Sequence, residues 1–111
     1  MNDKELLELA AKAAGVKALW SPDGVLRDCT NGHPAQNIYS APPWNPLVND
    51  GDALRLAVKL GLAINITPSK IYASDGRIDG VNEVMDTSDP YAASRRAIVR
   101  AAAEIGKWEG E

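Results

Sequence analysis

The sequence predicts a single α+β domain: a layered α/β sandwich with a mostly antiparallel sheet and three helices. The chain has 111 residues, the usual size of one domain, so residues 1–111 are expected to share one core. Its apolar fraction of 45% is that of an ordinary globular protein. Along the chain, segments whose apolar residues recur with the spacing of a helix alternate with segments whose spacing is that of a strand. The predicted order is helix, two or three strands, helix, two or three strands, helix.

The first helix is predicted between Asn2 and Gly15. Asn2 and Glu5 have the spacing of a capping box, and Gly15 stands where a left-handed residue ends a helix. One face of this helix is apolar and is expected to be buried: Leu6, Leu9, Ala10 and Ala13.

Two short strands are predicted next, at 16–20 and 25–30. The intervening Ser21-Pro22-Asp23-Gly24 favours a tight reversal, so the two strands are expected to form a hairpin. Residues 31–46 are rich in turn formers and are expected to be an irregular surface loop within the domain, with a short strand at 37–40.

The second helix is predicted to begin in Asn49-Asp50-Gly51-Asp52, whose side chains can cap its first turn, and to end at Gly61. Its apolar residues cover a broad arc, which suggests burial on more than one side: Ala53, Leu54, Leu56, Ala57, Val58 and Leu60.

Strands are predicted again after Gly61. Leu62, Ile64 and Ile66 alternate with more polar residues, as in a strand with one buried face. Residues 70–74 are expected to return as its partner, and 81–85 to form a further strand after the Asp-Gly turns. The order of strands in the sheet stays open.

The last helix is predicted from Asp89-Pro90 through Lys107, because a capping residue followed by proline starts a helix. Its core stripe is expected to be Tyr91, Ser94, Ile98, Ala101, Ala102 and Ile105. Arg96, Arg100 and Glu104 are expected on the opposite, solvent-facing side, with Arg95 and Lys107 nearer the flanks.

Composition narrows the classes of function. The one cysteine, Cys29, excludes an intramolecular disulfide and the CxxC pattern of a zinc site, and fits a reducing compartment. The sequence has neither the pattern of an export signal nor 18 consecutive apolar residues. A net charge of −3 argues against a dedicated nucleic-acid binder.

No catalytic, cofactor-binding or metal-binding set emerges from the sequence. Cys29 and His33 are close in sequence but lack a recognisable third group. Asn49-Asp50-Gly51-Asp52 resembles the start of a calcium loop, yet lacks the later glutamate, and capping explains it better. An acidic series separated by glycines fits turn chemistry better than acid–base catalysis: Asp75, Asp79, Glu83 and Asp86.

Two groups of residues are candidate contact sites. Arg95, Arg96 and Arg100 give the last helix a positive surface that suits phosphates or an acidic partner, although a solvated face is the commoner explanation. The loop residues Tyr39, Pro42, Pro43 and Trp44 suit a protein contact. For Trp44 we favour the alternative, a core plug that seals the start of the second helix together with Leu47.

Three segments resemble the small phage and prophage proteins of the phage ABA sandwich domain family: 6–15, Trp44 through Leu60, and Arg95 through Ala103. Residues 21–43 and 68–88 look variable beside them. This resemblance implies a layered α/β sandwich encoded by a bacteriophage and acting in the cytoplasm of the infected or lysogenic host. It carries over no reaction and no catalytic residues.

These observations lead to one expected function and one alternative. The first is a non-enzymatic phage accessory protein that binds a host or phage protein, with host takeover and anti-defence both open as roles. The alternative is a nucleic-acid or nucleotide binder that uses the arginines of the last helix. No cofactor is expected, and a homodimer is left open, because an Ala-rich helix or an unpaired edge strand can support one.

Overall fold

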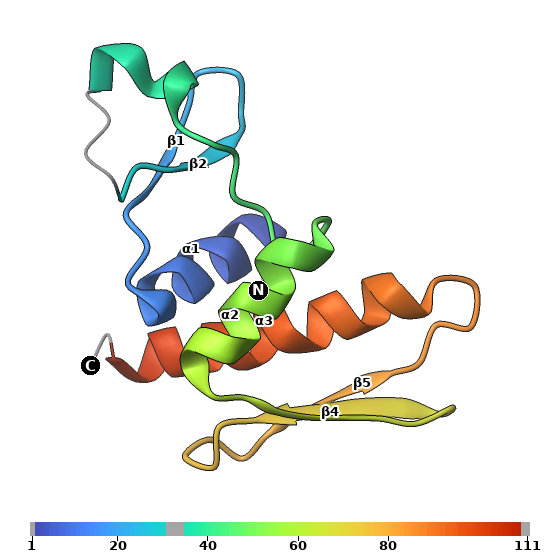
Figure 1. Cartoon of the computed structure of the whole chain (residues 1–111). Helices are drawn as coiled ribbons and strands as arrows, with labels where there is room; N and C mark the ends of the chain where they lie inside the picture. Colours follow the sequence, from blue (N-terminus) through green and yellow to red (C-terminus); the bar gives the residue numbers. More distant parts are fainter. Residues whose placement is uncertain (1, 31–34, 110–111) are drawn as a thin grey trace.

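The computed structural model describes residues 2–30 and 35–109 (Figure 1). Within these ranges it has three α-helices and two antiparallel sheets, so the predicted α+β class is confirmed. The strands do not join one sheet: β1 and β2 form one, and β3, β4 and β5 form the other. No helix in the described ranges is both long and apolar enough to cross a membrane.

Helix α1 spans Asp3–Ala14 and has the predicted caps. The side chain of Asn2 accepts from the backbone N–H of Glu5 at 2.8 Å, and Gly15 adopts a left-handed φ of 71°. Its buried face differs from the predicted one, because Leu7, Ala11 and Ala14 are buried in place of Leu9 and Ala13. The buried residues are Leu6, Leu7, Ala10, Ala11 and Ala14. Leu9 and Ala13 are only half-buried.

Helix α3 spans Pro90–Glu109 and lies at the centre of the molecule, between α1, α2 and the sheet of β4 and β5 (Figure 1). Because neighbours surround it, most of its buried residues are small: Ala93, Ala97, Ala101, Ala102, Ala103 and Gly106. Tyr91 was predicted in the core stripe, and this is wrong. It is 69% exposed, and the first turn of α3 lies beyond the reach of α1 and α2.

Helix α2 spans Asp50–Leu60 and is capped by Asn49 and Gly61, as predicted. Burial on more than one side is not found. Only Ala53, Leu56 and Ala57 are buried, whereas Leu54 and Val58 are 63% and 72% exposed. The helix packs on the body with one face and leaves an apolar flank open.

The larger sheet contains β3 (Ala63–Ile66), β4 (Lys70–Ser74) and β5 (Val81–Val84), each paired antiparallel with its neighbour in the chain. These three strands match the predicted ones closely. Helix α3 packs on β4 and β5 and buries Ile71, Ala73 and Val81. None of the helices in the described ranges covers the opposite face of the sheet (Figure 1).

The smaller sheet pairs β1 (Ala18–Trp20) with β2 (Leu26–Asp28), which confirms the hairpin. The strand predicted at 37–40 is wrong, because the chain forms a 3-10 helix, η1, over Ala35–Ser40. The element is kinked at Asn37, where φ is −129° and ψ is 40°. After the kink, Ala41 N–H donates to the Ile38 carbonyl at 3.0 Å, which closes a three-residue turn, and the Ser40 hydroxyl donates to the Asn37 carbonyl at 2.7 Å.

Candidate functional site

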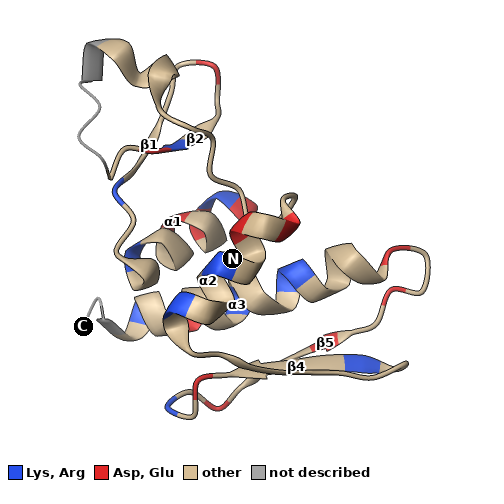
Figure 2. Cartoon of the chain, viewed as in Figure 1, with Lys and Arg blue, Asp and Glu red and all other residues tan. Residues whose placement is uncertain are grey.

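The hairpin and η1 form a lobe that projects from the helical body above α1 (Figure 1). We use "the lobe" for β1, β2, η1 and the segment 41–46. Residues 29–49 contain no Asp, Glu, Lys or Arg, although charged residues make up 24% of the chain. Figure 2 accordingly shows η1 and the following segment without charged residues. The lobe therefore combines projection from the body with a largely neutral surface.

A third backbone segment extends the small sheet on the side of β2. Asp28 N–H donates to the Pro42 carbonyl and Trp44 N–H donates to the Leu26 carbonyl, both at 2.9 Å. Leu19 pairs with Arg27 in the hairpin, and Arg27 forms a bridge with Pro43. Residues directly opposite one another in an antiparallel pairing share a face of the sheet. Leu19, Arg27 and Pro43 therefore lie in a row on one face of the lobe.

Arg27 fixes this row to η1. Its Nη1 donates to the Ala41 carbonyl at 3.0 Å, and its Nε donates to the Ser21 hydroxyl at 3.1 Å. The guanidinium carbon lies 5.4 Å from the centre of the Tyr39 ring, a cation–π contact. Because the Arg27 side chain is only 12% exposed, its contacts are largely shielded from water. The ring of Tyr39 is thus held against a fixed, positively charged support.

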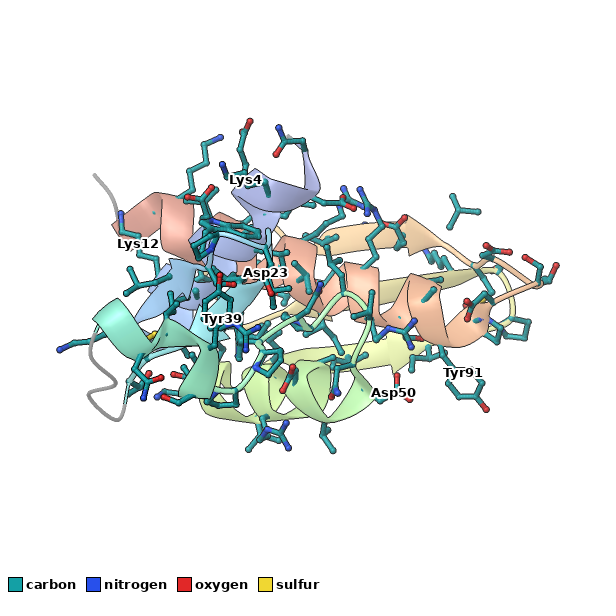
Figure 3. All side chains as sticks on the ribbon, turned by 90° about the horizontal axis from the view of Figure 1, so that it is seen from above. Lys4, Lys12, Asp23, Tyr39, Asp50 and Tyr91 are labelled. Carbon is teal, nitrogen blue, oxygen red and sulfur yellow. The ribbon has the colours of Figure 1, made fainter. Side chains whose placement is uncertain are left out.

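Asp23 completes the support of the guanidinium. Arg27 Nη2 lies 3.2 Å from its carboxylate, to which the Ser21 hydroxyl also donates. The Ser21 hydrogen bond and the Arg27 charge, with the Val25 N–H, hold the pKa of Asp23 below its usual value. Seen from above, Tyr39 and Asp23 lie close together on the lobe, whereas Tyr91 lies far away beyond Asp50 (Figure 3).

We call Leu19, Arg27, Tyr39 and Pro43 the outer patch. Leu19 is 48% exposed, Tyr39 is 56% exposed, and Pro43 is exposed as well. An aromatic ring, a proline, a leucine and an arginine are side chains suited to protein interfaces, where aromatic residues and arginine are enriched. The patch can bind, but it holds no group positioned for covalent or acid–base chemistry.

The four loop residues predicted to make a protein contact do not share one surface. Tyr39 and Pro43 belong to the outer patch, but Pro43 also lines a pocket together with Pro42 and Trp44, and Tyr39 does not. Trp44 is 7% exposed and packs in the main core, so its assignment to a contact surface is wrong and the plug is confirmed. In this core cluster Trp44 lies with Leu26 of β2 and with Ala53 and Leu56 of α2.

Sequence reasoning missed Leu19 and Arg27. A signal was present, since both occupy the middle of their strands in a hairpin that had been predicted. What the sequence could not indicate is that the 41–44 segment returns to pair with β2.

The arginines of α3 do not share one free basic face. Arg95 is 16% exposed and bonds to the Leu47 carbonyl and to Asp50, at 2.8 and 2.6 Å. Arg96 lies 3.1 Å from the Asp3 carboxylate on α1, and Arg100 pairs with Glu83 on β5. Each guanidinium therefore joins α3 to a different element.

The other candidate groups have structural roles. Asn49 caps α2 by accepting from Asp52 N–H at 2.9 Å, and the Asp52 carboxylate pairs with Arg55. Within residues 2–30 and 35–109, no three His, Cys, Asp or Glu side chains cluster as metal ligands do. Cys29 is buried beside Ile38 and Ala41, and His33 lies outside the described residues.

The acidic series lies in turns except for Glu83, where the prediction is wrong, because Glu83 belongs to β5 and pairs with Arg100. The Asp75 carboxylate accepts from the backbone N–H groups of Arg77 and Ile78 at 2.9 and 3.3 Å, and pairs with the Arg77 side chain. Burial alone would raise the pKa of Asp75. The hydrogen bonds from Arg77 and Ile78 lower it by more, so the pKa of Asp75 lies below its usual value. Asp86 accepts from the Ser88 hydroxyl and N–H, which lowers its pKa too.

An open groove separates α1 from the hairpin. It has a volume of about 670 Å³ and is lined by side chains of both elements, among them Glu8, Lys12 and Trp20. The indole Nε1 of Trp20 is buried without a hydrogen-bond partner among the described residues, and the Lys4 ammonium lies 5.5 Å from the ring centre. Cys29 also lines the groove.

Comparisons with known protein families, with curated proteins and with solved structures found no match to this chain.

Proposed function

We propose that this chain is a non-enzymatic accessory protein of a bacteriophage that binds a host or phage protein through the outer patch. The phage setting, with action in the cytoplasm of the bacterial host, rests on the resemblance of residues 6–15, 44–60 and 95–103 to the phage ABA sandwich domain family. The binding role rests on the lobe.

One observation carries the proposal: Tyr39 is an exposed aromatic ring whose position is fixed before any partner arrives. Binding normally costs about 0.5–1.5 kcal/mol for each side chain that must be immobilised. The Arg27 contacts reduce this cost at the ring, because the guanidinium beneath it is already bonded to Ser21, Asp23 and Ala41. A rigid aromatic on a neutral surface is a typical anchor of a protein interface.

The alternative, binding of nucleic acid through Arg95, Arg96 and Arg100, lacks such an observation. Each of these guanidinium groups already pairs with a carboxylate of the chain, so a phosphate would have to compete with that carboxylate. The geometry favours the outer patch over this surface.

The experiment compares variants of two exposed tyrosines as bait in bacterial lysate at moderate salt. Tyr39→Ser removes the ring from the outer patch. Tyr91→Ser is the matched control, because Tyr91 is even more exposed, at 69%, and lies at the far end of α3 (Figure 3). Circular dichroism first establishes that both variants keep the fold.

The proposal expects one protein to be recovered reproducibly with the wild type and with Tyr91→Ser, and to be lost or strongly reduced with Tyr39→Ser. Recovery of no protein by the wild type contradicts a protein partner. Equal recovery by both variants contradicts the outer patch as its site.

A further inference from the structure

The two edges of the larger sheet differ in how they are protected. At the β5 edge, Arg100 Nη1 donates to the outward carbonyl of Asn82 at 3.1 Å and also pairs with the Glu83 carboxylate. A charged side chain laid along an edge strand hinders pairing with another strand, and natural sheets use this device. The β5 edge is therefore blocked by the chain itself.

At the β3 edge, the described part of the chain supplies no such protection. In an antiparallel pair, the backbone groups of successive residues point alternately toward the partner strand and away from it. Thr67 N–H donates to the Lys70 carbonyl, so Thr67 and every second residue before it point toward β4. Ala63 and Asn65 then direct their backbone groups toward β4, and Ile64 and Ile66 direct theirs outward. Residues 60–67 contain no charged residue and no proline, and Ile66 is 57% exposed. Among residues 2–30 and 35–109, no hydrogen-bond partner covers the outward backbone groups of this apolar strand.

Helix α2 adds apolar surface beside this edge. Asp52, Arg55 and Lys59 line the pocket that faces the lobe. Residues of an α-helix follow one another at about 100°, so Leu54 and Val58 lie on the other flank of α2. Helix α2 ends at Leu60, and β3 begins three residues later at Ala63. The side chains of Leu54 and Val58 are both largely exposed.

We propose that β3 pairs antiparallel with β3 of a second copy of this chain, about a two-fold axis at Asn65. Ile64 then exchanges backbone hydrogen bonds with Ile66 of the second copy, and the two three-stranded sheets become continuous.

The occupant is a second copy because the strand is complementary to itself. Pairing about Asn65 places isoleucine beside isoleucine and brings no charged residue of either strand against another. The assembly stops at two chains, because Arg100 blocks the remaining edge of each sheet.

Introducing a charge at Asn65, on the two-fold axis, tests this arrangement. Asn65 is exposed on the face of the sheet without helices, so its substitution leaves the monomer core untouched. In the proposed pairing, Asn65 lies opposite its own counterpart. Asn65→Lys or Asn65→Asp alone therefore places like charges together and is expected to weaken the dimer at least about tenfold. A mixture of the two variants places opposite charges together.

Sedimentation velocity over a concentration series is the measurement. We expect the wild type to be a dimer, each Asn65 variant to be largely monomeric, and the mixture to regain the dimer. Asn82→Lys is the matched control, an exposed asparagine on β5 of the same sheet, and is expected to remain dimeric. Ile66→Lys provides a second test at the β3 edge if an Asn65 variant fails to fold.

Two results would overturn the proposal. A wild type that stays monomeric at every concentration leaves no dimer to explain. A wild-type dimer that the Asn65 and Ile66 variants do not weaken, or that Asn82→Lys weakens equally, places the interface elsewhere.

Discussion

Gly106→Ala is expected to destabilise the fold, although alanine is the better helix former. Gly106 lies inside α3 where this helix crosses α1, and a Cβ at this position would lie 2.0 Å from the Leu9 carbonyl oxygen and 2.9 Å from its carbonyl carbon. Because these are backbone atoms in the interior of α1, no side-chain rotation relieves the clash. The two helices must move apart by more than an ångström.

Two opposing effects set the magnitude. Replacing glycine by alanine inside a helix favours folding by about 1 kcal/mol. Overpacking of a closely packed core costs about 3 kcal/mol at the upper end of the usual range, and a backbone clash belongs there. The net loss is therefore about 2 kcal/mol, which lowers the melting temperature of a domain of this size by about 8 °C.

Thermal unfolding followed by circular dichroism measures the effect, with Gly51→Ala as the control. Gly51 is also helical, but a Cβ there would meet only the side-chain ends of Arg55 and Asn49, at 3.2–3.3 Å. The end of Arg55 can swing away and the capping oxygen of Asn49 must give by only a few tenths of an ångström, so this variant is expected to lose far less stability than Gly106→Ala. If Gly106→Ala melts at or above the wild-type temperature, the close α1–α3 crossing is refuted.

Three further predictions concern single contacts. Asn49→Ala removes the cap of α2 and is expected to lower the unfolding free energy by about 1 kcal/mol in urea titrations. Asp75 stabilises the fold at neutral pH because its pKa is lower in the folded than in the unfolded state. This stabilisation is lost as the pH falls through the folded pKa. Asp75→Asn is therefore expected to lose less stability than the wild type between pH 7 and about pH 3. Arg100→Ala opens the β5 edge and is expected to increase light scattering at high concentration.

Each of these predictions has an outcome that contradicts it. An unchanged urea midpoint for Asn49→Ala would mean that the cap contributes nothing. Parallel acid unfolding of Asp75→Asn and the wild type would mean that the carboxylate is not stabilised in the folded state. Light scattering of Arg100→Ala no greater than that of Lys107→Ala, a charge removal at the exposed end of the same helix, would mean that Arg100 does not protect the sheet.

Local signals predicted the elements well. The caps at Asn2 and Asn49 and the left-handed glycines at 15 and 61 act within one helical turn, and the structure contains all four. The alternation of apolar and polar residues at 62–66 predicted β3 correctly, because this signal is local too: neighbouring side chains of a strand point to opposite faces.

Long-range packing explains what the sequence did not predict. Tyr91 and Val58 lie on apolar arcs of their helices, but an arc does not reveal how far the neighbouring elements extend over it. The arginines of α3 look like one basic face until the chain brings Asp3, Asp50 and Glu83 to them, at sequence separations of 17 to 93 residues.

The outer patch shows the same division between local and long-range signals. Tyr39 and Pro43 were identified from their residue types, because aromatic and proline residues in a loop favour contact surfaces. Arg27, which holds Tyr39 in place, depends on the return of 41–44 to β2 and on its hydrogen bond to the Ala41 carbonyl. A single sequence carries no signal for that return.

Site-specific photo-cross-linking in bacterial cells tests the central claim most directly. A photoreactive phenylalanine analogue replaces Tyr39 in one variant and Tyr91 in another, and cross-linked products are identified by mass spectrometry. The account predicts a cross-link from position 39 to one defined protein and none to that protein from position 91. The same product from both positions, or none from position 39, would contradict the outer patch as the contact surface.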